Sequence, residues 1–120
     1  MALNQGNLGN ITVIQAGQTS AVYTVGSAQT AYVRSLLFHS LDDTNTLNAS
    51  VHVVPNSGGS AGTAATGNRI ARLGISTEDT YFFECIYPIT LTANGDTIQV
   101  QNEAAANASI NVLVLGDKEV

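Results

Sequence analysis

The chain has 120 residues, the length of one domain, with nine acidic and four basic side chains and a net charge of −5. Because phosphate binding needs clustered Lys and Arg, this composition argues against nucleic acid as a direct partner. The N-terminal MALNQGNLGN has no positive charge, and no stretch approaches the ~20 apolar residues of a membrane span, so we expect no signal peptide, no membrane partner and assembly in a cytoplasm.

Alternation of apolar and polar residues predicts strands from the first third of the chain onward. NITVIQ and SAVYTVG are short β-branched runs that end at Gly or small residues. AYVRSLLFHS is apolar on both faces around Leu36, Leu37 and Phe38, which suits a strand in the middle of a sandwich. NASVHVVP is predicted to end at Pro55, because proline cannot donate a hydrogen bond to a ladder.

The second half of the chain continues the pattern. RIARLGIS alternates around Leu73, and the aromatic-rich DTYFFECIYP is predicted to end before Pro88. DTIQVQN follows Asn94-Gly95, a pair typical of tight hairpin turns, and SINVLVLG is the last predicted strand. The eight predicted strands span residues 10–15, 20–25, 31–39, 48–54, 69–75, 80–87, 97–102 and 109–115.

Short strands at a spacing of ~8–12 residues, separated by turn signals, predict an all-β fold. About eight strands favour an antiparallel β-sandwich that is jelly-roll-like or Greek-key, and the strand order stays open. We assign residues 1–9 to an N-terminal arm, residues 10–116 to the β-sandwich domain and residues 117–120 to a C-terminal tail.

The sequence carries no catalytic signature, so we expect no enzyme activity, no catalytic residue and no cofactor. His39 and His52 are the only histidines; they are either a metal pair or, as we favour, ordinary strand residues, because no third ligand has a recognisable spacing. Cys85, the single cysteine, is expected to be a buried small hydrophobe rather than a reactive thiol.

The tyrosines also have two interpretations. Tyr23, Tyr32, Tyr81 and Tyr87 are either surface aromatics that bind a ligand or, as we favour, core residues.

Residues 1–33 contain no charged side chain, although sheet edges are normally guarded by charges or proline. These strands are therefore either internal to the sandwich or covered by another subunit. Residues 57–67 consist only of Gly, Ala, Ser and Thr and have little of their own to pack. They form either a loose connector or, as we favour, a loop ordered by contact with a neighbour. The predicted subunit-interface residues are Leu3, Asn4, Leu8, Ile11, Val13, Asn56, Ser57, Gly58, Gly59, Ser60 and Thr63.

The phrases VHVVPNSGGSAG, LTANGDTIQVQ and INVLVLG, in this order, carry a family likeness. With the strand and polar turn before them, they resemble the small β-sandwich structural proteins of tailed bacteriophages and related viruses of bacteria, over about residues 20–116. Such proteins serve as capsid cement or decoration proteins, or as small tail, neck or fibre components. The pattern contains no catalytic residue.

The resemblance implies a non-enzymatic virion protein, most concretely a cement protein that clamps the shell. Its expected partners are the major capsid protein or other virion subunits, and copies of itself in a homo-oligomer. The alternatives are a tail, neck or fibre component and a carbohydrate-binding β-sandwich module. The last would need exposed aromatics around a cleft, and the chain has no Trp.

Overall fold

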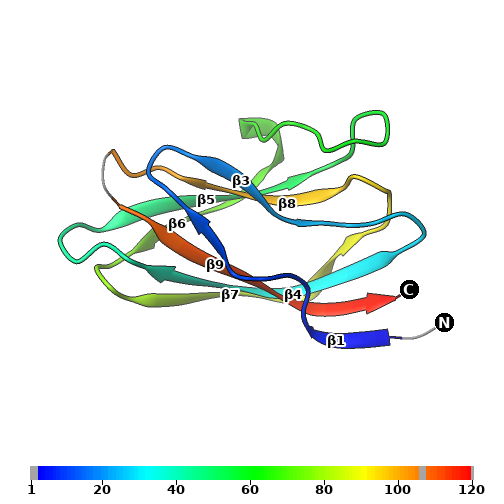
Figure 1. Cartoon of the computed structure of the whole chain (residues 1–120), viewed down its shortest axis with the longest axis horizontal. Coiled ribbons are helices and arrows are strands. Elements are labelled where there is room, and N and C mark those ends of the chain that lie inside the picture. The colour runs from blue at the N-terminus through cyan, green and yellow to red at the C-terminus, as the bar shows by residue number, and fades with distance from the viewer. Residues whose placement is uncertain (1–2, 106–107, 120) are drawn as a thin grey trace.

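The computed structural model describes residues 3–105 and 108–119, and of residues 3–5 only the backbone. Within these ranges, nine strands form two antiparallel sheets packed face to face (Figure 1). No helix in the described part of the chain is long and apolar enough to cross a membrane. The elements are β1 (Leu3–Asn7), β2 (Thr12–Ile14), β3 (Thr19–Thr24), β4 (Thr30–Ser40), β5 (Leu47–Val54), the 3-10 turn η1 (Thr66–Asn68), β6 (Arg69–Ile75), β7 (Thr80–Leu91), β8 (Thr97–Asn102) and β9 (Ile110–Glu119).

The strand pairing is that of a single antiparallel ribbon rolled into two sheets. Sheet A has the order β1-β9-β4-β7, with β2 also paired to β9, and sheet B has the order β3-β8-β5-β6. The pairs β2–β9, β3–β8, β4–β7 and β5–β6 describe one long antiparallel ribbon folded back at the β5–β6 connection. The β4–β9 and β5–β8 ladders roll this ribbon into two sheets. This is the jelly-roll arrangement, and the predicted all-β sandwich is confirmed.

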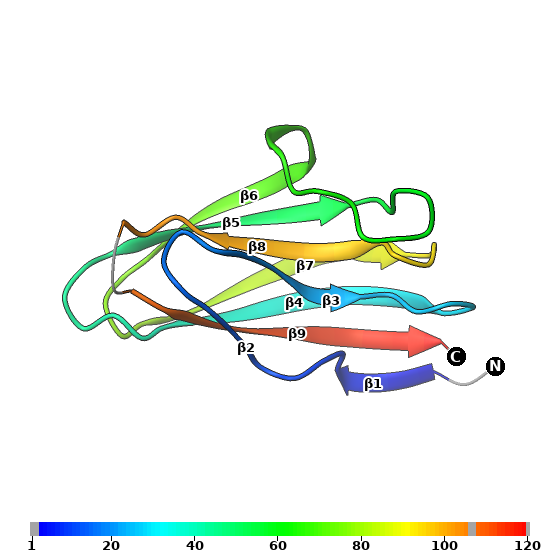
Figure 2. The ribbon, with the colours of Figure 1, turned by 45° about the horizontal axis from the view of Figure 1, so that its top comes forward.

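The ends of the chain lie side by side in sheet A. β1 pairs with the second half of β9, from Leu3 opposite Glu119 to Asn7 opposite Leu115, and β2 pairs with its first half (Figure 2). All eight predicted strands are present, but β1 was not predicted, because LNQGN has no apolar alternation. β9 also continues to Glu119 rather than ending at residue 115, since β1 and β4 supply ladder partners on both of its edges. Residues 3–7 of the expected arm and residues 117–119 of the expected tail therefore extend sheet A, while residues 1, 2 and 120 lie outside the described residues.

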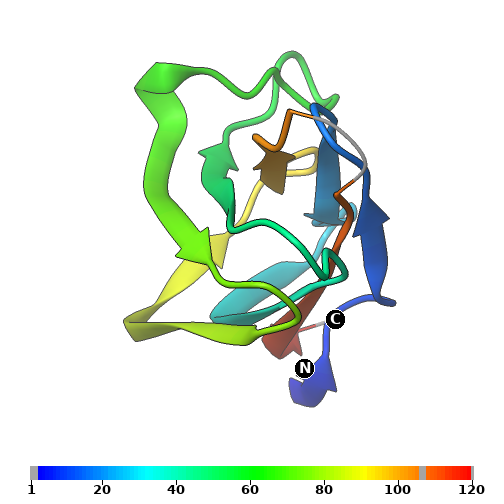
Figure 3. The ribbon, with the colours of Figure 1, turned by 90° about the vertical axis from the view of Figure 1, so that its left-hand side faces the viewer.

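The view along the long axis shows the two sheets facing each other (Figure 3). The buried hydrophobic side chains form a core between them. β4 confirms the prediction of a central strand, because it lies between β9 and β7. Leu36 and Phe38 are fully buried, whereas Leu37 is on the outer face of sheet A. The largest fully buried side chains are Phe38, Ile14, Leu36, Ile75, Leu91, Ile98 and Ile110.

A bulge interrupts both ladders of β4 at the same residue. Between the pairs Val33–Ile89 and Ser35–Glu84, β4 has only Arg34, while β7 has the four residues 85–88. The prediction that this strand ends before Pro88 is therefore wrong. β7 is the edge strand of sheet A, and Pro88 lies in the bulge, where no ladder partner is required.

On the other side of Arg34, β9 and β4 come unusually close. Val33 pairs with Gly116 and Ser35 with Leu115, so β4 has one residue more than β9 at this point. A Cβ atom at Gly116 would overlap the backbone carbonyl oxygen of Tyr32 and crowd the amide of Arg34. Only glycine fits there, because the obstructing atoms belong to the backbone and cannot rotate away.

We predict that Gly116→Ala lowers the free energy of unfolding by at least about 2 kcal/mol, the cost of overpacking against a rigid neighbour. Chemical denaturation followed by circular dichroism measures this change. Gly67→Ala is the matched control, because a Cβ atom at Gly67 meets nothing within 4 Å. Equal stability of the two variants would contradict the close approach at Gly116.

Candidate functional site

The small-residue segment 57–67 lies over the outer face of sheet B, next to the strands that it connects (Figure 1). The Gln99 side chain in β8 donates to the carbonyl oxygen of Gly62 at 3.0 Å. His52 in β5 lies beneath η1, with Nδ1 3.1 Å from the Ala65 carbonyl oxygen and 3.0 Å from Oδ1 of Asn68. Since both partners are acceptors, Nδ1 carries the proton and donates. The segment is held by its own sheet.

One glycine of this segment, Gly62, comes close to the end of β5. A Cβ atom at Gly62 would lie 2.6 Å from the carbonyl oxygen of Pro55 and 3.0 Å from a methyl group of Val54. A larger residue would lift the segment off the sheet. Our expectation that a neighbouring subunit orders this loop is therefore replaced by an intrachain cause. Residues 57–60 and Thr63 are nevertheless exposed, so their role in subunit contacts stays a prediction.

Asp96 fastens the start of the segment to the β7–β8 turn. Its Oδ1 accepts from the backbone and side-chain nitrogens of Asn56 at 2.8 and 3.1 Å, and its Oδ2 accepts from the Ala93 amide at 3.1 Å. Desolvation alone would raise the pKa of Asp96, but the hydrogen bonds from Asn56, Ala93 and Thr92 together outweigh it, and its pKa lies below the ordinary 3.8.

We predict that Asp96→Asn lowers the free energy of unfolding at neutral pH by about 1 kcal/mol. Because the folded-state pKa is depressed, the wild-type carboxylate stabilises the fold above its unfolded-state pKa, and this contribution is lost as pH falls through the folded-state pKa. The gap between the variant and the wild type should therefore narrow below about pH 4 in denaturation series. Asp43→Asn, in an exposed turn, is the control, and a gap independent of pH would contradict the account.

The N-terminal residues predicted at an interface lie on the other side of the sandwich. Leu3 and Asn4 are in β1, opposite Glu119 and Lys118. Leu8 is only 8 % exposed and belongs to the chain's own core, which leaves little of it for a partner.

Two of these predicted residues face solvent. Ile11 and Val13, next to and within β2, are 61 % and 56 % exposed. The predicted interface residues therefore form two groups, one on sheet A and one over sheet B, rather than one continuous surface.

Sheet A carries an apolar row that we did not predict. Leu113, Leu37 and Phe82 lie opposite one another on β9, β4 and β7, and Ile11 lines the same groove as Leu113 and Leu37. We call Ile11, Leu113, Leu37 and Phe82 the apolar row. The apolar residues on both faces of AYVRSLLFHS and INVLVLG were the signal for it, because only one face of each strand meets the core. The groove has a volume of about 340 Å³ and is lined by Ile11, Leu37, His39, Thr80, Asn111, Val112 and Leu113.

The bulge of β7 adds two exposed side chains at the sheet edge. Ile86 is 95 % exposed and Tyr87 is 85 % exposed, and Tyr81 in the same strand is also exposed. The preference for buried tyrosines is confirmed for Tyr23 and is wrong for Tyr81 and Tyr87. The error arises because β7 is an edge strand and has a bulge. The alternation of apolar and polar residues reveals neither feature.

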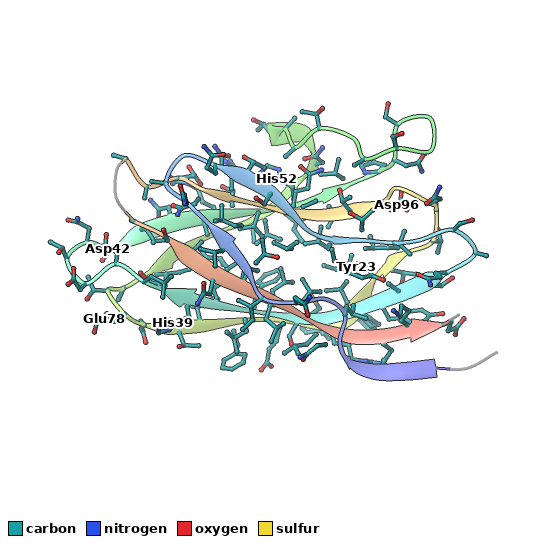
Figure 4. All side chains as sticks on the ribbon, in the orientation of Figure 1. Tyr23, His39, Asp42, His52, Glu78 and Asp96 are labelled. Carbon is teal, nitrogen blue, oxygen red and sulfur yellow. The ribbon has the colours of Figure 1, made fainter. Side chains whose placement is uncertain are left out.

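The side chains with potential chemistry are dispersed. His39 hydrogen-bonds to the Thr80 hydroxyl on sheet A, whereas His52 lies on sheet B, at the opposite side of the sandwich (Figure 4). A metal site that uses both histidines is therefore ruled out by their positions. Cys85 is partly rather than fully buried, and desolvation raises the pKa of its thiol, which disfavours the reactive thiolate.

No family model and no curated protein matches the chain. A chain from a structure of infectious bursal disease virus, Gx strain, is similar over 98 % of this chain and 36 % of its own length, with 10 % identity and a TM-score of 0.45. A chain from Nora virus is similar over 92 % of this chain and 55 % of its own, with 10 % identity and a TM-score of 0.46. This chain therefore spans about a third and about half of those two chains.

A third similar chain comes from Bacillus endospore appendages, described as disulfide-linked pili. The likeness covers 100 % of this chain and 94 % of that one, with 17 % identity and a TM-score of 0.41. All three TM-scores lie below 0.5, and the jelly-roll arrangement of this chain rests on its own strand pairing.

Proposed function

We propose that the chain is a non-enzymatic virion structural protein, most concretely a capsid cement or decoration protein that stabilises contacts between major capsid subunits. The observation that carries the proposal is the apolar row across the outer face of sheet A. Soluble monomers rarely expose large continuous apolar patches, and such patches mark surfaces that bind other proteins or ligands. On this account sheet A lies against the capsid shell.

Composition and family resemblance point in the same direction. Only 11 % of the residues are charged, and the negative net charge keeps the protein away from the packaged genome. A shell offers many equivalent sites, so a modest contact made by an oligomer gains strength through avidity. The phrases that resemble phage structural proteins lie in the sandwich itself, in β5, β8 and β9 and the segments beside them. The protein is then located in the virion and is assembled in the host cytoplasm.

The absence of enzyme activity is part of the same proposal. His39 is hydrogen-bonded to Thr80. The protonated Nδ1 atom of His52 donates to Ala65 and Asn68, which lie in the segment over sheet B. Catalysis by a nucleophile needs a base within hydrogen-bond reach of an activated group. Neither histidine is bonded to a cysteine or serine side chain among the described residues.

One observation favours a second candidate, a carbohydrate-binding module. Phe82 is exposed beside a groove that also holds the polar side chains of His39, Thr80 and Asn111. Aromatic faces with nearby hydrogen-bonding groups suit sugar rings. A tail, neck or fibre component would use the same apolar surface as a cement protein and differs from it only in the partner.

The test is binding to empty shells assembled from the major capsid protein of the same genome. Deleting residues 1–9 would remove β1 and the buried Leu8, so point variants are sharper. The double variant Ile11→Ser, Val13→Ser should lower affinity for shells at least about tenfold, because two exposed side chains lose about a kcal/mol or more of buried apolar contact. Ile70→Ser, the same change on the exposed face of β6 in sheet B, is the matched control.

Co-sedimentation gives the affinity, and the temperature at which shells disassemble gives the function. The proposal predicts saturable binding and a higher disassembly temperature with wild type and the control, whereas the double variant should need at least about tenfold more protein for the same effect. Shells that neither bind nor gain heat resistance would contradict a cement role. Specific hits on a glycan array would then favour the carbohydrate-binding candidate, and binding to purified tails would favour a tail component.

A further inference from the structure

A histidine lies beneath the segment that covers the outer face of sheet B. We call residues 56–68, the small-residue segment together with the asparagines at its two ends, the strap. The imidazole of His52 lies between the strap and sheet B, and this residue is only 4 % exposed. Histidine is the side chain that ordinarily changes its charge between about pH 5 and pH 8. The strap therefore covers the kind of side chain that can respond to pH.

Hydrogen bonds within the strap fix the proton of His52 at Nδ1. The Asn68 side chain donates from Nδ2 to the carbonyl oxygen of Thr63 at 3.0 Å, and its Oδ1 accepts from the Ala65 amide at 2.9 Å. This orientation of the Asn68 side chain places two acceptors next to Nδ1 of His52. They are Oδ1 of Asn68 at 3.0 Å and the carbonyl oxygen of Ala65 at 3.1 Å. Nδ1 therefore donates, and Nε2 of the neutral ring carries a lone pair and no proton.

The Nε2 atom of His52 is closed off from solvent. It is buried and, among the residues that the structure describes, has no hydrogen-bond partner. Protonation would place an N–H group there without an acceptor and would add a positive charge to the ring. Burial of an unpaired charge costs more than burial of an unpaired neutral acceptor. The closed strap accordingly accommodates the neutral ring and opposes the charged one.

The charged side chains around His52 would not compensate a charge on the ring. Its ladder partners are Arg69 on β6 and the neutral Gln99 on β8. Arg72 lies farther along β6, and its guanidinium is already paired with Glu103 at 3.0 Å. The strap has no charged residue, and β5 has no titratable residue besides His52. The charged neighbours of the ring are thus two cations and one carboxylate that is bonded to one of them.

We propose that the strap is a pH-sensitive cover of sheet B, closed at and above neutral pH and opened in mild acid, when the released His52 ring takes up a proton. An imidazole in water is protonated below about pH 6.5, so in that range the open form binds one proton more than the closed form. The stability of the closed strap therefore rises with pH and is lost as the pH falls below that value. Opening exposes polar side chains of sheet B such as Gln99.

Hydrogen exchange of the purified chain, followed by NMR between about pH 5 and pH 8, tests the proposal. The two reporters are the Ala65 amide, which donates to Asn68, and the side-chain amide of Gln99, which donates to Gly62. Each exchange rate is divided by the rate in an unfolded peptide at the same pH, which gives the protection. Below about pH 6.5 the protection should fall by up to about tenfold per pH unit. The Leu8 amide, bonded to β9 in sheet A, is the internal control and should keep its protection.

Two variants separate the histidines. His52→Asn keeps a side-chain donor near the position of Nδ1 but cannot take up a proton, so its strap protection should not depend on pH. His39→Gln is the matched control, because His39 is bonded to the Thr80 hydroxyl on the opposite sheet, and it should respond to pH like wild type (Figure 4).

The ring nitrogen signals of His52 in wild type give a measurement that needs no variant. Protonation of the ring and loss of strap protection should have the same midpoint. Strap protection that stays constant between about pH 5 and pH 8 would overturn the proposal. Protonation of His52 under a strap that stays protected, or loss of the pH response in His39→Gln, would overturn it as well. The test uses the isolated chain and sheet B, so its outcome is separate from shell binding by sheet A.

Discussion

The ladder between β4 and β9 is the interaction on which the rest of the structure depends. It joins the middle of the chain to its end along the full length of both strands. The inner side chains of this ladder, such as Phe38 and Val112, close the core, while Leu37 and Leu113 meet on the outer face. One residue in the ladder, Arg34, interrupts the register. That interruption requires glycine at position 116 and coincides with the β7 bulge that exposes Tyr87.

The two outer faces of the sandwich differ in polarity and in whether a segment of the chain covers them. Sheet B presents polar side chains such as Gln99 and His52 and hydrogen-bonds its own loop across them. Sheet A presents the apolar row and has no described segment laid over it. Large continuous apolar patches are rare on soluble monomers and usually mark binding surfaces. This physical argument supports the proposed shell contact.

Alternation and turn residues were enough to predict eight strands and the fold class, because ladder strands that cover a core must alternate. They could not reveal β1, which is polar and is held in place by backbone pairing with β9. Nor could they reveal that Pro88 lies inside a strand, since a bulge on an edge strand leaves no periodic trace. The apolar row was visible in AYVRSLLFHS and INVLVLG, but a strand central to a sandwich explains such runs equally well. The outer face of β4 becomes a candidate site only when the structure shows it uncovered.

The central claim is that the outer face of sheet A is buried in the assembled state. Hydroxyl-radical footprinting of the free chain and of the chain in its assembled particle measures this burial side chain by side chain. The account predicts that modification of Phe82, Tyr87 and Leu113 falls severalfold on assembly, while modification of Ile70 on sheet B stays constant. Unchanged modification of Phe82 and Leu113 in the particle, or protection confined to Ile70, would contradict it.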